Sequence, residues 1–86
     1  MSLNKSETKV YRLDHKPSLK EAQELVGGYV EMKELRNGDQ ILFNEEGKLM
    51  GLPVNVEATD IFTSPGNYAD YIVGNAIILS GENKWV

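Results

Sequence analysis

The sequence predicts an α+β domain: a mostly antiparallel sheet with two short helices packed on one face. Three observations predict this class. Apolar and polar residues alternate in short runs, two other stretches begin with helix-capping residues, and an Asn-Gly pair separates two apolar runs. The expected order of elements is β-α-β-β-α-β, as in ferredoxin-like folds. We expect a single domain over residues 8–80, with flexible termini at residues 1–7 and 81–86.

A strand and a helix are expected in the first third of the chain. Residues 8–14 (TKVYRLD) are rich in β-branched and aromatic side chains, which favours a strand that ends before Pro17. Ser18 is placed to cap the helix that follows, with Glu21 three residues later as in a capping box, and Gly27 is placed to end it. The apolar side chains of this segment recur at helical spacing: Leu19, Ala22, Leu25 and Val26.

The next segment predicts an antiparallel hairpin. Residues 29–35 (YVEMKEL) alternate with a period of two, which places Val30 and Met32 on one face of a half-buried strand. Asn37-Gly38 then predicts a type I′ turn, because both residues tolerate positive φ. Residues 40–44 (QILFN) contain a continuous apolar run, which is typical of a strand covered on both sides.

A second helix and a last strand are expected further along. Asn55 is placed to cap a short helix with Glu57 in its first turn. Residues 63–67 (TSPGN) have the composition of a loop. Residues 70–81 (DYIVGNAIILSG) are the most apolar run and predict a central strand, in which Gly74 marks either a bulge or a close approach by another segment.

Composition and charge exclude several classes of function. The chain has 86 residues, of which 41% are hydrophobic, so its core is small and a homodimer is expected to supplement it. The net charge is −4 and the nine Lys and Arg residues are scattered, which disfavours nucleic-acid binding. No cysteine, secretory signal or membrane-length apolar run is present, so we expect a cytoplasmic protein that does not bind membranes.

No catalytic or metal-binding pattern stands out. His15, the only imidazole, lies between Asp14 and Ser18 in what looks like a surface connection, so we assign it no catalytic role. Neither the EF-hand spacing of acids nor a phosphate-binding glycine loop occurs, so no metal or cofactor is expected. Acid-base catalysis would need two converging carboxylates, and the sequence does not indicate which pair would converge among Glu31, Glu45, Glu46, Glu57, Asp60 and Asp70.

Polar residues gather in the stretch over residues 44–59 (NEEGKLMGLPVNVEAT), between the buried strand and the second helix. The free amides of a helix start capped by Asn55 are suited to a small anion or a polar ligand edge. In the alternative interpretation Asn55 only caps, Pro53 stiffens the approach, and Gly47 and Gly51 supply turns. The candidate ligand-binding residues are Glu31, Asn44, Glu45, Lys48, Asn55 and Thr59.

Three ordered blocks, LVGGYVEMKEL, FNEEGKLMGLPVNVEAT and YIVGNAIIL, carry a resemblance. Together they resemble a family of short proteins of unknown function encoded largely by bacteriophages, plasmids and their bacterial hosts. The resemblance covers residues 13–79 and implies an accessory protein that works by binding a host protein or a small signalling molecule; it implies no catalytic residue. The matching positions are Val26, Gly27, Gly28, Glu31, Asn44, Glu45, Gly47, Leu52, Pro53, Asn55, Ala58, Thr59, Ile72, Val73 and Gly74.

Two functions of different classes follow as hypotheses. The first is a non-enzymatic, homodimeric interaction protein that binds a host protein through an exposed face. The second is a protein that binds or sequesters a nucleotide-like molecule at the loop over residues 44–59, where Lys48 or Arg36 would offset the negative net charge. The aromatic residues available to stack on a base are Tyr29, Tyr68 and Tyr71. An enzyme of unrecognised type is a third possibility.

Overall fold

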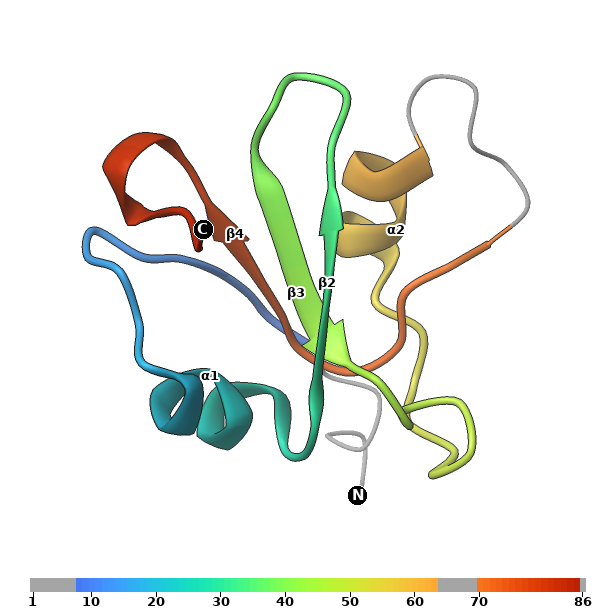
Figure 1. Cartoon of the computed structure of the whole chain (residues 1–86). Helices are drawn as coiled ribbons and strands as arrows, with labels where there is room; N and C mark the ends of the chain where they lie inside the picture. The colour runs from blue at the N-terminus through green and yellow to red at the C-terminus, as the bar shows by residue number, and fades with distance from the viewer. Residues whose placement is uncertain (1–7, 64–69, 86) are drawn as a thin grey trace.

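The computed structural model describes residues 8–63 and 70–85 and has the predicted α+β class (Figure 1). A four-stranded sheet has the strand order β1-β4-β3-β2. The elements are β1 (Val10–Arg12), α1 (Leu19–Val26), β2 (Val30–Glu34), β3 (Gln40–Asn44), α2 (Val56–Thr63), β4 (Ala76–Leu79) and the 3₁₀ turn η2 (Gly81–Asn83). Neither helix in the described part of the chain is long and apolar enough to cross a membrane.

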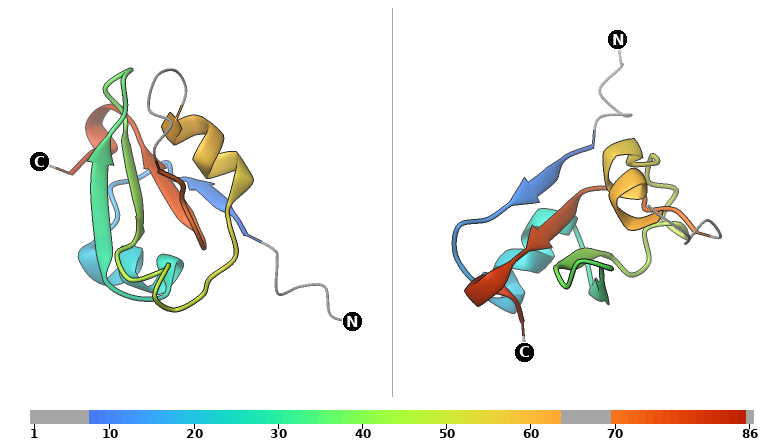
Figure 2. Two further views of the ribbon diagram at one scale, coloured as in Figure 1. Left: turned by 90° about the vertical axis from the view of Figure 1, so that its right-hand side faces the viewer. Right: turned by 90° about the horizontal axis from the view of Figure 1, so that it is seen from above.

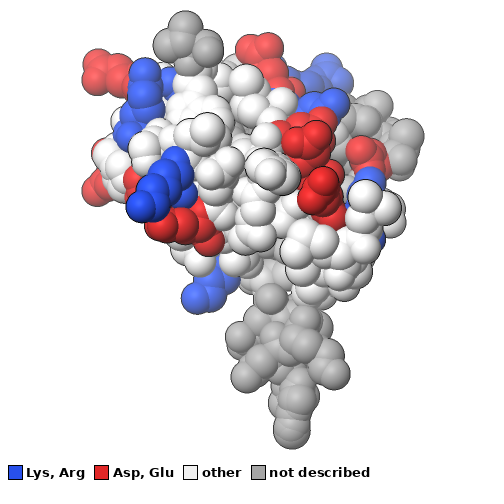
Figure 3. All heavy atoms as spheres, turned by 60° about the horizontal axis from the view of Figure 1, so that its bottom comes forward, with Lys and Arg blue, Asp and Glu red and all other residues white. Residues whose placement is uncertain are grey.

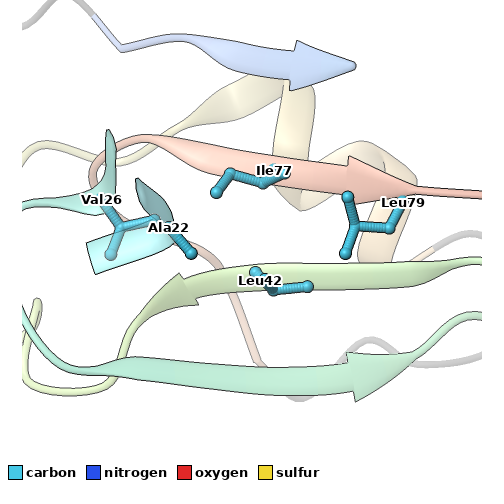
Figure 4. Close-up of a cluster of buried hydrophobic side chains, with 5 residues drawn as sticks. All are labelled: Ala22, Val26, Leu42, Ile77 and Leu79. Carbon is cyan, nitrogen blue, oxygen red and sulfur yellow. The ribbon is translucent and has the colours of Figure 1, made fainter. Parts of the chain in front are cut away.

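The two helices lie on opposite faces of the sheet, and the prediction that both cover one face is wrong (Figures 1 and 2). On one face Ala22 and Val26 of α1 pack against Leu42, Ile77 and Leu79 (Figure 4). A second cluster is buried on the opposite face, where Ala58 of α2 contributes to it. Its residues are Ile41, Ala58, Ile72, Ala76 and Ile78. Both β3 and β4 are apolar on both sides, so each face needs its own cover.

The sheet is mixed and is not ferredoxin-like in its strand order. The β2–β3 and β3–β4 pairs are antiparallel, as expected of a mostly antiparallel sheet. However, β1 pairs in parallel with β4, with Val10 opposite Ala76. The first and last strands are therefore neighbours, and β2 and β1 form the two edges of the sheet.

Helix α1 begins and ends as predicted. The Ser18 hydroxyl accepts a hydrogen bond from the Glu21 amide at 3.0 Å, and Gly27 is left-handed with φ of 84°. The Gly28 amide donates to the Gln23 carbonyl, which is the longer-range bond of a Schellman ending, and the Gly27 amide donates to the same carbonyl. The Glu21 carboxylate contacts His15 in the preceding loop. It therefore does not complete the capping box by accepting from the Ser18 amide.

The hairpin forms with a turn of a different type from the one predicted. A type I′ turn requires positive φ at both central residues, but among the described residues positive φ occurs only at glycines. The Gly38 amide donates to the Leu35 carbonyl and the Leu35 amide donates to the Asp39 carbonyl. This is a type I turn followed by a bulge at Gly38, with φ of 93°.

The predicted last strand is shorter than its apolar run. Val73 forms only an isolated bridge with Val54, and regular pairing begins at Ala76. Gly74 between them has φ of 75°, and a Cβ there would lie 2.8 Å from Leu52 Cδ1. Both a backbone bend and a close approach therefore require glycine at this position.

The segment that follows β4 is packed against the domain. Trp85 lies against the α1-side core, and its indole nitrogen donates to the Pro17 carbonyl at 2.9 Å. The Gln40 side chain donates to the Trp85 carbonyl and accepts from the Trp85 amide. Trp85, in the segment that we predicted to be a flexible terminus, thus contacts the core.

Candidate functional site

Asn44 is buried, and its side chain links three segments. Its amide nitrogen donates to the Val26 carbonyl at the end of α1 and contacts Met50 Sδ at 3.6 Å. Its carbonyl oxygen accepts from the Glu46 amide at 2.8 Å. A Cβ at Gly28 would lie 2.9 Å from the Asn44 amide nitrogen, so glycine is needed for this close approach. These contacts give Asn44 a structural role.

Asn55 and Thr59 also engage the backbone. The Asn55 side chain accepts from the Ala58 amide, which caps α2, and donates to the carbonyls of Lys9 and Gly74 at 3.0 and 2.8 Å. The Thr59 hydroxyl accepts from the Ile72 amide at 2.9 Å and lies 3.3 Å from the Ile72 carbonyl. The two side chains hold α2 to the segments that lead into β1 and β4.

A polar hollow of about 120 Å³ lies beside strand β2, on the α2 side of the sheet. It brings together four of the six predicted ligand-binding residues: Glu31, Asn44, Glu45 and Lys48. Lys33, Phe43, Asp70, Tyr71 and Val73 complete the lining. Asp70 was considered as a carboxylate for acid-base chemistry and Tyr71 as an aromatic residue to stack on a base, whereas Lys33 was not predicted. Glu31, Glu45 and Asp70 are the carboxylates that converge, whereas Glu46, Glu57 and Asp60 do not line this hollow.

The charges of the polar hollow are largely compensated within it. Lys48 forms an ion pair with Asp70, and its ammonium lies 4.2 Å from the centre of the Tyr71 ring. The hydrogen bond between Lys48 and Asp70 lowers the pKa of Asp70 and raises the pKa of Lys48. Glu31 pairs with Lys33 at 3.6 Å. Both shifts favour the charged forms of Lys48 and Asp70 at neutral pH, so the arrangement is suited to holding a small polar molecule.

His15 lies between two carboxylates at the surface. Its Nδ1 is 3.1 Å from Asp14 Oδ1, and its Nε2 is 2.9 Å from Glu21 Oε2. Hydrogen bonds to Asp14 and then to Glu21 raise the pKa of His15, because the imidazolium donates from both nitrogens. The Ser18 hydroxyl caps α1, so this group of residues is a surface ion-pair cluster next to a helix start.

We expect His15→Ala to lower the melting temperature most near pH 5.5. The raised pKa of His15 contributes stability that is complete below the pKa of the unfolded chain, about 6.5, and is lost as the pH rises through the folded-state value. Thermal melts of wild type and His15→Ala should therefore differ near pH 5.5 and converge near pH 9. Lys16→Ala is the control, and a pH-independent difference for His15→Ala would contradict the assignment.

An apolar hollow that we did not predict lies between the end of α1 and the turn after β3. It measures about 350 Å³ and is lined by Gln23, Gly27, Gly28, Tyr29, Glu46 and Met50. Tyr29 and Met50 are 64% and 54% exposed, and the neighbouring Leu49 is 89% exposed. Adjacent Leu49 and Met50 in a glycine-flanked polar turn are the sequence signal for this surface.

Other predicted participants lie elsewhere. Arg36 is in the hairpin turn and lines neither hollow, while Tyr68 is outside the described residues. Among residues 8–63 and 70–85, no group of three His, Asp or Glu side chains is placed to hold a metal ion.

A model of a protein family matches nearly the whole chain. The match covers residues 3–85, and the family is described as Domain of unknown function (DUF3846). The chain belongs to this family. No curated protein and no solved structure matches it significantly. The DUF3846 match includes both hollows and the segment through Trp85.

Proposed function

We propose that this DUF3846 protein is a small accessory protein of a mobile element or its bacterial host, and that it acts by non-enzymatic protein–protein contact. The apolar hollow carries the proposal, because it combines large exposed side chains with a concave shape. Its partner would be a protein that inserts a large apolar side chain between Tyr29 and Met50. The resemblance of the three sequence blocks to phage and plasmid proteins supports the mobile-element setting.

The surface around the apolar hollow is typical of a binding site. Aromatic residues and methionine are enriched at protein interfaces, and charged residues are depleted at their centres. Figure 3, which looks toward the bottom of Figure 1, shows an uncharged area with Lys, Arg, Asp and Glu side chains at its margins. Glu46 lines the hollow and the net charge of the chain is −4, so basic residues around the inserted side chain would complement it.

The walls of the apolar hollow are held in place before any partner binds. Asn44 ties the end of α1 to Met50, and the Leu52 amide closes the turn by donating to the Gly47 carbonyl at 3.1 Å. A preorganised surface loses less conformational entropy on binding. Asn44, which was a candidate for a ligand site, therefore supports the shape of a docking surface.

Site-specific photo-crosslinking in a bacterial host tests the proposal. We expect a photoreactive phenylalanine analogue at Leu49 to capture a defined protein, and the same analogue at Lys20 on α1 to capture none. Adding Met50→Asp to the Leu49 variant should reduce the yield about tenfold, because it places a charge in the apolar contact. Equal capture from both positions, or capture unaffected by Met50→Asp, would refute the assigned surface.

The alternative of a nucleotide-like ligand receives less support from the geometry. Pockets for molecules of that size are usually 300–1,000 Å³, whereas the polar hollow measures about 120 Å³. Asn44, Asn55 and Thr59 also direct their side chains to backbone groups. Native mass spectrometry of the purified protein discriminates the two functions, since a co-purified small-molecule mass lost in Glu45→Ala would favour the ligand.

A further inference from the structure

Strand β2 forms one edge of the sheet, and its outer side carries backbone groups that β3 does not use. In Figure 1 this edge faces the viewer, and no other element lies in front of it. Open edges pair readily with another strand unless their side chains oppose it. The residues of β2, Val30–Glu34, alternate between charged and uncharged side chains over their first four positions.

The hydrogen bonds to β3 identify which backbone groups point outward. The Glu45 amide donates to the Tyr29 carbonyl, and the Leu35 amide donates to the Asp39 carbonyl. In an antiparallel pair such bonded positions alternate along the strand, so residues 31 and 33 also face β3. The amides and carbonyls of residues 30, 32 and 34 therefore point away from the sheet.

These outward groups allow few two-fold registers for a second copy of β2. Antiparallel pairing needs outward residues opposite one another, which leaves residue 31, 32 or 33 on the two-fold axis. With residue 31 or 33 on the axis, Glu31 would face the partner's Glu31, or Lys33 would face the partner's Lys33. Like charges directly opposite are unfavourable. With Met32 on the axis, Glu31 faces the partner's Lys33, and Lys33 faces the partner's Glu31.

We propose that the protein forms a homodimer through β2, with Met32 on the two-fold axis and the two sheets joined into one. Outward backbone groups then bond between copies, and Glu31 and Lys33 form two symmetric cross-strand ion pairs. Because Glu31 and Lys33 line the polar hollow, the partner's Lys33 would border the hollow of the first copy. The interface is small, so we expect a dissociation constant of roughly micromolar size.

This inference does not rest on the proposed function. The proposed partner surface is the apolar hollow at Tyr29 and Met50, whereas the dimer uses the outer backbone of β2 and the pair Glu31 and Lys33. Variants of Met50 test the first surface, and charge variants of β2 test the second.

Charge exchange tests the dimer and its register together. We expect wild-type protein to sediment at twice the chain mass of 9.6 kDa at high concentration. Glu31→Lys alone and Lys33→Glu alone should each raise the dissociation constant about tenfold or more, because both ion pairs become repulsive. An equimolar mixture of the two variants should form heterodimers, and the double variant, whose net charge is unchanged, should form homodimers again.

Two controls separate this interface from general electrostatic and folding effects. Glu24→Lys changes the net charge by the same amount on exposed α1 and should leave the dimer unchanged. Met32→Pro removes an amide that points away from β3, so the monomer should keep its circular dichroism spectrum and the dimer should be lost. A monomeric wild type at about 200 μM, dimeric single variants, or failure of the double variant to dimerise would overturn the proposal.

Discussion

Replacing Asn55 with alanine is expected to lower the free energy of unfolding by about 3 kcal/mol or more. The side chain is 1% exposed, and its loss would leave the Ala58 amide and the Gly74 carbonyl without the partner that Asn55 supplies. The Lys9 carbonyl, which Asn55 also contacts, would keep its bond from the Ala76 amide. Each buried group left without a partner costs about 1–3 kcal/mol. Urea denaturation followed by circular dichroism measures the change.

Asn55→Asp separates the two roles of this side chain. A carboxylate can still accept from the Ala58 amide, but it cannot donate to the Lys9 and Gly74 carbonyls. We expect Asn55→Asp at neutral pH to be at least as destabilising as Asn55→Ala. Ser18→Ala, which removes an exposed cap, should cost only about 1 kcal/mol. If Asn55→Asp were as stable as wild type, capping alone would explain the residue.

Replacing Trp85 with alanine is the second change with a large expected effect. We expect a loss of about 3 kcal/mol, since the indole packs on the core and donates to the Pro17 carbonyl. Trp85→Phe should recover most of the packing but not the hydrogen bond. Equilibrium urea denaturation gives both values, with exposed Glu82→Ala as the control. A Trp85→Ala protein as stable as the control would show that this residue does not hold the domain together.

The secondary structure was largely predictable from local signals. Ser18 caps the start of α1 and left-handed Gly27 ends it, as predicted. Asn55 caps α2, and β3 coincides with the QILFN run. These features depend on residues a few positions apart, which a sequence displays directly. The hairpin was also predictable, although its loop has three residues, with positive φ only at Gly38, which gives a type I turn with a bulge in place of the type I′ turn.

The arrangement of the elements was less predictable. A continuous apolar run in β3 and β4 indicates cover on both faces, but no local signal assigns α1 to one face and α2 to the other. The pairing of β1 with β4 joins residues such as Val10 and Ala76, which are far apart in the chain. Trp85 was assigned to a flexible end because the residues around it are mostly polar. Its contacts, Pro17 and Gln40, are 68 and 45 residues away in the chain, so no local signal indicates them.

The candidate site was predicted in part. The prediction selected polar residues by type, and Glu31, Glu45 and Lys48 do line one hollow with Asn44. Nothing in a single sequence distinguishes an asparagine that holds distant carbonyls from one that faces a ligand, so the backbone contacts of Asn55 could not be foreseen. The apolar hollow forms because the Gly27-Gly28 turn lies next to Met50 in the folded chain. Only the tertiary structure shows that these two segments are neighbours.

The parallel pairing of β1 with β4 has a mechanical consequence. A force that pulls residues 8 and 85 apart would slide these strands past each other along their lengths, since they run in the same direction. The hydrogen bonds between them would then carry the load together, unlike those of a hairpin, which open one after another. The Asn55 side chain, bonded to the Lys9 and Gly74 carbonyls, bridges the same two segments just before the strands begin. We therefore expect the domain to resist stretching from its ends more strongly than its small core implies.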